Sequence, residues 1–361
     1  MGLTIDRGRL TVSLLGALMA ALLATACAPL RSLPAEKEAP FLWEHATKDY
    51  VRGHAASAQG IIFFGSDDNA LHAIAADSGV ALWSVVTHDN VTGRPAVTLN
   101  SVCFGSWDGT IRCVDQVTGE ALWVHQAKGP VSGALAAQDE TVYAGSHDGW
   151  VYALTRDTGQ LRWRVCTGGL LHAGVVLAGN ALYASSLDSY LYAIDASDGS
   201  VLWRHRLGGG AYGLPLVSES VVFSASTDRF LYALNARDGS VLWKRDLGAA
   251  SEVGVALVDG LVIAGANDGG VQAYSAMSGR PVWRYQTRGP IRGGPVSCEG
   301  SVFVGSDDHG VYAISSEGQL EWRYVTGGQV LGAPGCAAGR IYAGSTDGAL
   351  HAFLVSKELA P

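Results

Sequence analysis

The chain has 361 residues, 48% of them hydrophobic and only 16% charged, and its formal net charge is −8. An acidic balance of this size argues against nucleic acid as a partner. The 47 glycines indicate many turns, and the apolar fraction is sufficient for a large core, so we expect one folded domain.

Residues 1–26 have the features of a secretory signal peptide: Arg7 and Arg9 are basic, residues 10–23 are apolar, and small residues precede Cys27. The apolar run is short for a membrane span. Two interpretations remain open, namely a lipoprotein signal with Cys27 as the lipidated first residue, or ordinary cleavage after Ala26. The segment resembles a bacterial lipobox, with Ala24 where leucine is usual. We expect residues 27–40 to form an exposed, proline-containing tether.

From residue 41 the sequence repeats a unit of about 40 residues. Residues 230–245 show its parts, which are an apolar run, an Asp-Gly turn and a second run with a tryptophan. The repeated tryptophans, spaced by 40 residues and once by 39, are Trp43, Trp83, Trp123, Trp163, Trp203, Trp243, Trp283 and Trp322. This period predicts an all-β fold, an eight-bladed β-propeller of four-stranded antiparallel blades over residues 41–355, followed by a tail at 356–361.

The fifth repeat predicts four strands, A to D, at residues 211–217, 221–226, 230–236 and 241–247. Strand D is expected at the outer edge because it carries charge after the tryptophan. The pattern opens with a lone D-like strand near Trp43 and ends without a D strand after residue 353. The amino-terminal strand should therefore complete the last blade and close the ring.

Strand B carries a large residue opposite an alanine of strand C in most repeats, which is a favourable packing of large against small. The second repeat has Cys103 and Cys113 there instead. They form either a disulfide across the strand pair or two small buried thiols. The other cysteines after the tether, Cys166, Cys298 and Cys336, have no metal-like spacing and are expected to be small buried residues.

One aspartate recurs in every repeat. The eight copies are Asp68, Asp108, Asp148, Asp188, Asp228, Asp268, Asp308 and Asp347. An aspartate in a Gly-containing hairpin is ordinary turn chemistry, and no copy has the further oxygen ligands of a calcium loop. We therefore expect no metal site.

Residues 113–123 and 193–203 read CVDQVTGEALW and AIDASDGSVLW, and they resemble the tryptophan-docking repeat of PQQ-type propellers. The resemblance covers nearly all of residues 41–355. It implies one of two classes, the quinoprotein dehydrogenases, which bind pyrroloquinoline quinone (PQQ) and calcium, or BamB-like outer-membrane lipoproteins, which scaffold barrel assembly without a cofactor. A signal that ends at Cys27, followed by eight repeats, is similar to the BamB-like class.

The dehydrogenase class builds its quinone site on long insertions, for which repeats of 39 or 40 residues leave almost no room. We therefore predict a non-enzymatic scaffold with no PQQ or calcium. The expected protein is a monomer, exported and anchored by lipid to the outer membrane facing the periplasm, or at the cell surface if there is no outer membrane. The expected partner is an envelope protein such as the barrel-assembly machinery. The alternatives are an exported binder of a small anionic ligand in the propeller funnel, and a minimal quinoprotein.

Two sets of candidate residues lie where the repeats differ, on the face shared by the D to A and B to C loops. At the start of strand A, three arginines cluster on one side of the funnel. They predict an anion site, unless Arg292 pairs with Glu252 and the others are hydrated. The funnel set is Arg52, His54, Arg94, His172, Tyr212, Glu252 and Arg292.

The second set is a group of large side chains in the B to C region of blades 2 to 5, of the types that dominate protein–protein hot spots. Its members are Trp107, His147, Trp150, Leu187, Tyr190, Arg229 and Phe230. For Trp150, Tyr190 and Phe230 the alternative is burial against neighbouring blades. Trp107 and His147 lie in the turn itself, where burial is harder.

Overall fold

The computed structural model describes residues 38–355. The predicted signal peptide, Cys27, nearly all of the tether and the tail lie outside the described residues. No helix within residues 38–355 is long and apolar enough to cross a membrane.

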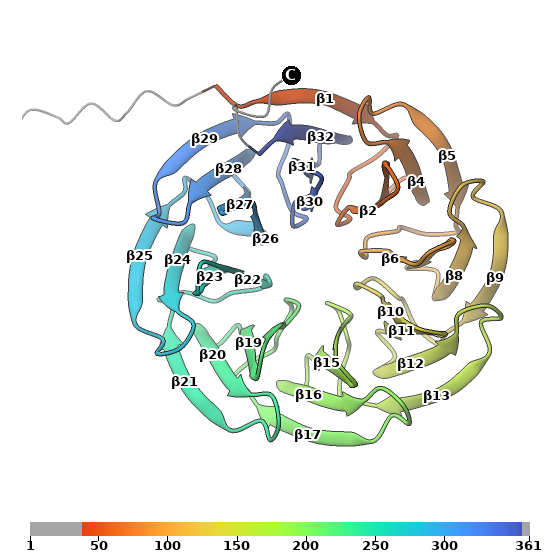
Figure 1. Cartoon of the computed structure of the whole chain (residues 1–361), viewed down its shortest axis with the longest axis horizontal. Helices are drawn as coiled ribbons and strands as arrows, with labels where there is room; N and C mark the ends of the chain where they lie inside the picture. The colour runs from red at the N-terminus through yellow and green to blue at the C-terminus, as the bar shows by residue number, and fades with distance from the viewer. Residues whose placement is uncertain (1–37, 356–361) are drawn as a thin grey trace, which may run out of the picture. The chain divides into compact units, whose positions relative to one another are not determined.

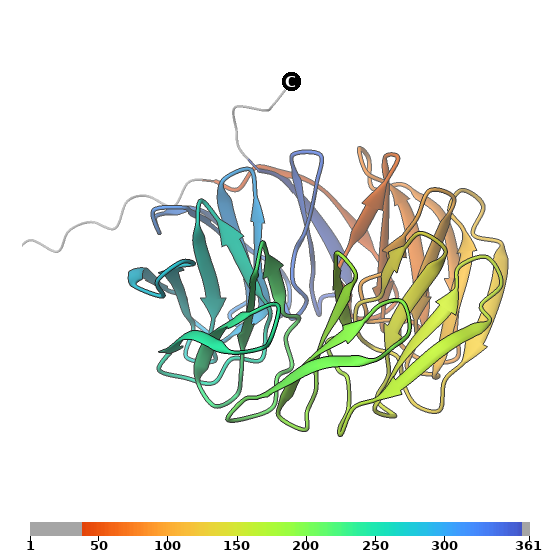
Figure 2. The ribbon, with the colours of Figure 1, turned by 60° about the horizontal axis from the view of Figure 1, so that its bottom comes forward.

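The described residues form eight four-stranded antiparallel sheets arranged as blades around one axis, which confirms the predicted propeller (Figure 1). In each blade the strands follow one another from the axis outwards. The inner strands run close to the axis direction and the outer strands are strongly tilted, as the twist of a sheet requires (Figure 2).

The first four blades are each continuous in sequence. Blade 1 comprises β2 (Ala56–Ala58), β3 (Ile61–Ser66), β4 (Ala70–Ala75) and β5 (Ala81–Val86). Blade 2 comprises β6 (Ala96–Val97), β7 (Ser101–Gly105), β8 (Thr110–Asp115) and β9 (Ala121–Gln126). Blade 3 comprises β10 (Ala136–Gln138), β11 (Thr141–Gly145), β12 (Trp150–Thr155) and β13 (Leu161–Cys166). Blade 4 comprises β14 (Val175–Ala178), β15 (Ala181–Ser185), β16 (Tyr190–Asp195) and β17 (Val201–Arg206).

The last four blades include the one that joins the two ends of the propeller. Blade 5 comprises β18 (Leu216–Ser218), β19 (Val221–Ala225), β20 (Phe230–Asn235) and β21 (Val241–Asp246). Blade 6 comprises β22 (Val255–Val258), β23 (Leu261–Gly265), β24 (Gly270–Ser275) and β25 (Pro281–Gln286). Blade 7 comprises β26 (Ile291–Cys298), β27 (Ser301–Ser306), β28 (Gly310–Ser315) and β29 (Leu320–Val325). Blade 8 comprises β30 (Gly335–Ala337), β31 (Arg340–Gly344), β32 (Ala349–Leu354) and, outermost, β1 (Phe41–Ala46).

The ring closes as the sequence predicted, because β1 is the outer strand of blade 8. It pairs antiparallel with β32, with Phe41 opposite Phe353 and Ala46 opposite Ala349. In Figure 1 the red β1 lies directly outside the dark blue β32. Every blade therefore has four strands, although only the first seven are continuous in sequence.

The predicted inner strand of blade 5 is too long: β18 begins at Leu216 rather than at residue 211. A Cβ atom on Gly213 would lie 2.2 Å from the carbonyl group of Val253 in the next blade. The segments that enter neighbouring blades lie so close together near the axis that residues before Leu216 form no β-ladder hydrogen bonds with the next strand of their own blade. The other three strands of this blade match their predicted bounds to within one residue.

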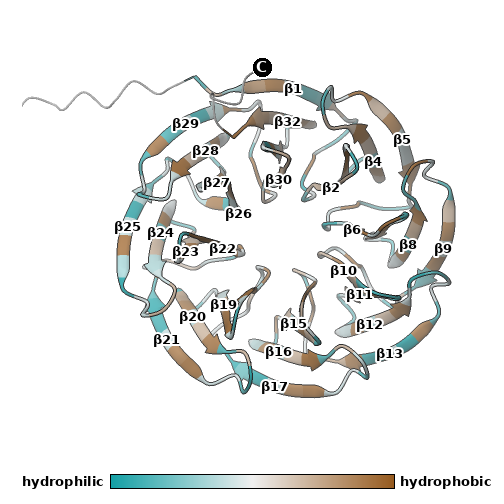
Figure 3. Ribbon diagram, viewed as in Figure 1, coloured by the Kyte–Doolittle hydropathy of each residue, from teal (hydrophilic) through white to brown (hydrophobic). Residues whose placement is uncertain are grey.

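Packing within a blade follows a large–small–large rule across strands B, C and D. In blade 1, Phe63 lies opposite Ala73, and Ala73 lies opposite Trp83. The small alanine lets the two rings approach to 5.7 Å between centroids. The predicted B to C pairs are all in register, and the outer strands carry both apolar and polar stretches (Figure 3).

The repeated tryptophans dock each blade on the next, as predicted. The indole N–H of Trp203 in β17 donates to the carbonyl of Ala236 in blade 5 at 2.8 Å. Its ring covers Gly239, where a Cβ atom would lie 2.6 Å from the ring and where φ is +70°. Glycine is therefore required at this turn for its backbone conformation and for the close approach of the ring.

The repeated aspartates hold the turns together. The Asp108 carboxylate accepts hydrogen bonds from the backbone N–H of Thr110 at 2.8 Å and of His88 at 3.1 Å. The second bond ties the B to C turn to the loop that enters the same blade. Equivalent bonds from a residue 20 positions earlier reach six of the other aspartates.

The structure pairs Cys103 with Cys113 as a disulfide, with Cα atoms 4.0 Å apart on facing positions of β7 and β8. It also pairs Cys298 with Cys336 in a disulfide that joins blades 7 and 8. The sequence analysis missed this disulfide, because it interpreted both cysteines as small buried residues. Cys336 and the free Cys166 are exposed rather than buried, so that interpretation holds only for the burial of Cys298.

Candidate protein-interaction face

The face that carries the D to A and B to C loops is built the same way in all eight blades. In each repeat a residue of the B to C turn donates its backbone N–H to a carbonyl 17 positions earlier, as Trp107 does to Asn90 at 2.9 Å. This bond fixes the two loops side by side. It also places the side chain of the turn residue beside that of the residue at the start of strand A, 15 positions earlier.

We call these two side chains the rim pair of a blade. The eight rim pairs are Arg52 with Asp67, Thr92 with Trp107, Ser132 with His147, His172 with Leu187, Tyr212 with Thr227, Glu252 with Asn267, Arg292 with Asp307, and Leu331 with Thr346. Five of them are in direct polar contact. The rim pairs therefore decide the chemistry of this face blade by blade.

In blades 2 to 5 the rim side chains form a continuous line of rings, which we call the aromatic crescent: Trp107, His147, His172 and Tyr212. Ring centroids are 5.1 Å apart from the first to the second, 5.7 Å from the second to the third, and 5.7 Å from the third to the fourth. Residues from the predicted partner set and from the predicted funnel set thus belong to one surface.

The crescent is uncharged at neutral pH. Burial lowers the pKa of His172 below its ordinary value, and burial together with the neighbouring His172 lowers the pKa of His147. One ring nitrogen of His147 lies 2.7 Å from the Ser132 hydroxyl, and the Trp107 N–H donates to the Thr92 hydroxyl at 2.9 Å. These bonds hold the His147 and Trp107 rings in place, whereas His172 and Tyr212 are exposed to solvent.

On the half of the face opposite the crescent, the charged rim residues of blades 1, 6 and 7 pair with one another, so the predicted cluster of three arginines is not a free cationic site. Arg52 forms an ion pair with Asp67. Arg292 forms one with Glu252, as the alternative interpretation proposed, and also lies 3.5 Å from Asp307. Arg94 is not a rim residue and lies deeper, in the axial cavity described below.

The remaining aromatics of the predicted partner set lie farther out on the same blades, each half-buried beneath a cation from strand D. Arg164 lies 4.6 Å from the ring centroid of Trp150, and Arg204 lies 5.1 Å from that of Tyr190. Lys244 lies 3.7 Å from the centroid of Phe230. These three contacts form a second, cation-covered arc outside the crescent. All three residues are half-buried, so burial against neighbouring blades covers only part of each ring.

Two residues of the predicted partner set have other roles. Arg229 lies on the outer side of its turn, in a left-handed backbone conformation with φ of 75°, 3.5 Å from Asp246. Leu187 packs between the crescent and its neighbouring loop, beside Gly210. Leu170, whose carbonyl accepts the Leu187 N–H, is 42% exposed and was missed by the sequence analysis. The sequence signal for Leu170 is a leucine in the loop two positions before the start of strand A.

The sequence matches the family model described as outer membrane protein assembly factor BamB over residues 40–165, 147–290 and 267–356. No curated protein matches the sequence.

Three solved structures illustrate the breadth of the fold. BamB from Moraxella catarrhalis has a TM-score of 0.76 at 20% identity, over 88% of this chain and 100% of that one. Quinohemoprotein alcohol dehydrogenase from Comamonas testosteroni has a TM-score of 0.75 at 15% identity, over 87% of this chain and 76% of that one. Sqt1 from Saccharomyces cerevisiae has a TM-score of 0.77 at 17% identity, over 89% of this chain and 100% of that one. At these identities the likeness concerns the fold alone. The family match, in contrast, extends across the whole propeller, and the chain belongs to the BamB family of PQQ-like β-propellers.

Proposed function

We propose that this protein is a non-enzymatic scaffold of the cell envelope that binds a protein partner through the aromatic crescent of blades 2 to 5. The observation that carries the proposal is the contrast between the two halves of one face. On one half, ion pairs such as Arg292 with Glu252 satisfy their own charges. On the other half, neutral rings stand in an unbroken line.

The crescent suits a protein partner for physical reasons. Its rings have few rotatable bonds, and hydrogen bonds already fix Trp107 and His147, so little conformational entropy is lost on binding. They offer apolar area that is released from water at contact, and aromatic side chains dominate hot spots. The cation-covered arc outside it supplies charges at the rim of the same patch, as in many interfaces.

Export, lipidation at Cys27 and a place at the outer membrane belong to the same proposal. The amino-terminal sequence and the description of the matching family support them. Catalysis is left out of the proposal. The dehydrogenase with the same fold extends beyond the part that this chain matches, and the recurring aspartates here serve the turns of the fold.

The test is an affinity capture from solubilised envelope, with the wild type beside the double variant Trp107→Ala/Tyr190→Ala. We expect the wild type to recover a component of the barrel-assembly machinery, and the double variant to recover at least about tenfold less, because two ring contacts are lost. Quantitative immunoblotting or mass spectrometry measures the difference.

The matched control is Asn267→Ala/Thr346→Ala, which changes the repeat position of Trp107 in blades 6 and 8, on the half of the face opposite the crescent. The control variant should capture the partner as the wild type does. Thermal melts should show that both double variants are folded. Equal capture by all three proteins would contradict the crescent as the binding surface.

A further inference from the structure

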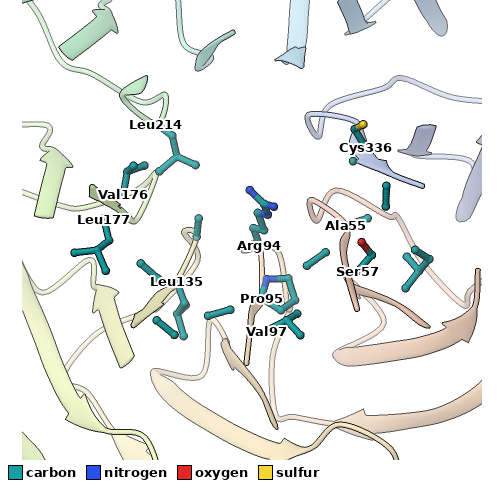
Figure 4. Close-up of a pocket in the computed structure, with 18 of the residues that line it drawn as sticks. Ala55, Ser57, Arg94, Pro95, Val97, Leu135, Val176, Leu177, Leu214 and Cys336 are labelled. Atoms are coloured by element: carbon teal, nitrogen blue, oxygen red, sulfur yellow. The ribbon is translucent and has the colours of Figure 1, made fainter. Parts of the chain in front are cut away.

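A cavity of about 350 Å3 lies on the propeller axis, walled by the inner strands of blades 1 to 4 and 8 and by Leu214 from the loop that enters blade 5 (Figure 4). Most of its wall is small and apolar, including Ala55, Ala96, Leu135, Val176, Leu177 and Leu214. None of its lining residues is acidic. A cavity of this kind favours an apolar occupant unless a charged group enters it.

Arg94 is that charged group. Its side chain extends from the wall toward the middle of the cavity, and Figure 4 shows its nitrogens away from the surrounding chains. No ion pair or side-chain hydrogen bond joins its guanidinium to any residue in 38–355, in contrast to the paired Arg52 and Arg292. The Arg94 side chain is exposed to the cavity, and partial desolvation by the surrounding protein atoms lowers its pKa.

His54 holds the equivalent position in blade 1, one repeat of 40 residues earlier. Burial and the charge of Arg94 lower the pKa of His54 to about 4. The imidazole is therefore neutral at pH 7 and adds no second positive charge near Arg94. The cavity has one positive charge, that of Arg94, beside an apolar wall.

A guanidinium that has no protein partner and faces an apolar cavity attracts an anion, and its strongest partner is a carboxylate bound through two parallel hydrogen bonds. A single positive charge balances a monoanion. It would leave a phosphate dianion undercompensated in a protein whose net charge is already −8. The wall of Ala, Val and Leu matches an organic group attached to that anion rather than an inorganic ion.

We propose that the axial cavity binds a small monocarboxylate with an apolar body, its carboxylate on Arg94 and its body against Leu135, Val176 and Leu214. This binding site is separate from the aromatic crescent and does not depend on the proposed scaffold function. Its occupant would neutralise the single unpaired guanidinium of the funnel set.

The test is calorimetric titration of the exported chain with hexanoate and benzoate, and with hexanamide, benzamide and inorganic phosphate for comparison. We expect saturable binding of at least one carboxylate, at least about tenfold tighter than its own amide and than phosphate. Arg94→Ala should weaken that carboxylate about 10- to 100-fold. This variant should fold, because blade 3 carries Ala134 at the equivalent position.

The matched control is Arg237→Ala, which removes the same charge from an exposed turn of blade 5 and should leave the affinity unchanged. The proposal is overturned if neither carboxylate binds saturably, or if Arg94→Ala binds as the wild type does. Phosphate or the amides binding as tightly as the carboxylates would also overturn it, since the site would then not select an apolar monocarboxylate.

Discussion

Deleting residues 41–47, which contain β1, should destabilise the propeller by more than about 5 kcal/mol, enough to unfold a protein of ordinary stability. The strand supplies the outer ladder of blade 8 along β32. Trp43 covers Gly79 of blade 1, and a nitrogen of His45 lies 2.8 Å from the carbonyl of Gly79. The deletion therefore removes both the fourth strand of one blade and the contact that closes the ring.

The loss also exposes β32 as an unpaired edge, which favours aggregation. Expression yield, circular dichroism and denaturant titration measure the outcome. A rearranged chain tests the cause, because Leu354 donates its N–H to the carbonyl of Pro40 at 2.9 Å, so the end of β32 already lies beside the start of β1. Moving residues 40–47 to follow Val355 through a short Gly-Ser linker should restore stability. A stable, monomeric deletion variant would contradict the closure argument.

Trp203→Ala should lower the free energy of unfolding by about 3–5 kcal/mol, the usual range for removal of a large buried aromatic side chain. The ring is 8% exposed, lies 5.9 Å from the ring of Tyr183, and docks blade 4 on blade 5. Its loss leaves a cavity between blades and removes the indole hydrogen bond to the Ala236 carbonyl. Guanidinium titration followed by fluorescence or circular dichroism measures the change.

The control for this prediction is the neighbouring Leu202→Ala. Leu202 lies on the same strand, points outward and is 51% exposed, so the expected change is within about 0.5 kcal/mol. A Trp203→Ala variant within about 1 kcal/mol of the wild type would show that docking contributes much less than the geometry implies.

The fold was predicted closely from the sequence because each repeat contains the residues that determine how its strands pack. The spacing of the tryptophans, the Phe63–Ala73 type of pair and the incomplete last repeat together determined blade number, strand order and closure. The inner strand of blade 5 was predicted too long, since crowding at Gly213 depends on the neighbouring blade rather than on the local sequence. The disulfide of Cys298 with Cys336 joins two blades, and no spacing within one repeat points to it.

The sequence predicted the residues of the candidate site as two separate sets, and only the structure showed that rings of both sets form one surface. The separation of 15 positions that pairs Arg52 with Asp67 and Arg292 with Asp307 was visible in the sequence, but its meaning depends on the hydrogen bond between the two loops. That spacing would have shown that two of the three funnel arginines are neutralised. It would also have placed His172 and Tyr212 beside the partner set.

The most direct test of the account places a photo-reactive amino acid at Tyr212 or at Leu331 and irradiates living cells. The two positions are equivalent in the repeat, and Tyr212, at the end of the crescent, is 37% exposed. The account predicts a cross-linked adduct with an envelope protein from position 212 and none from position 331. An adduct from position 331 alone, equal adducts from both, or no protein adduct from position 212 would contradict binding through the crescent.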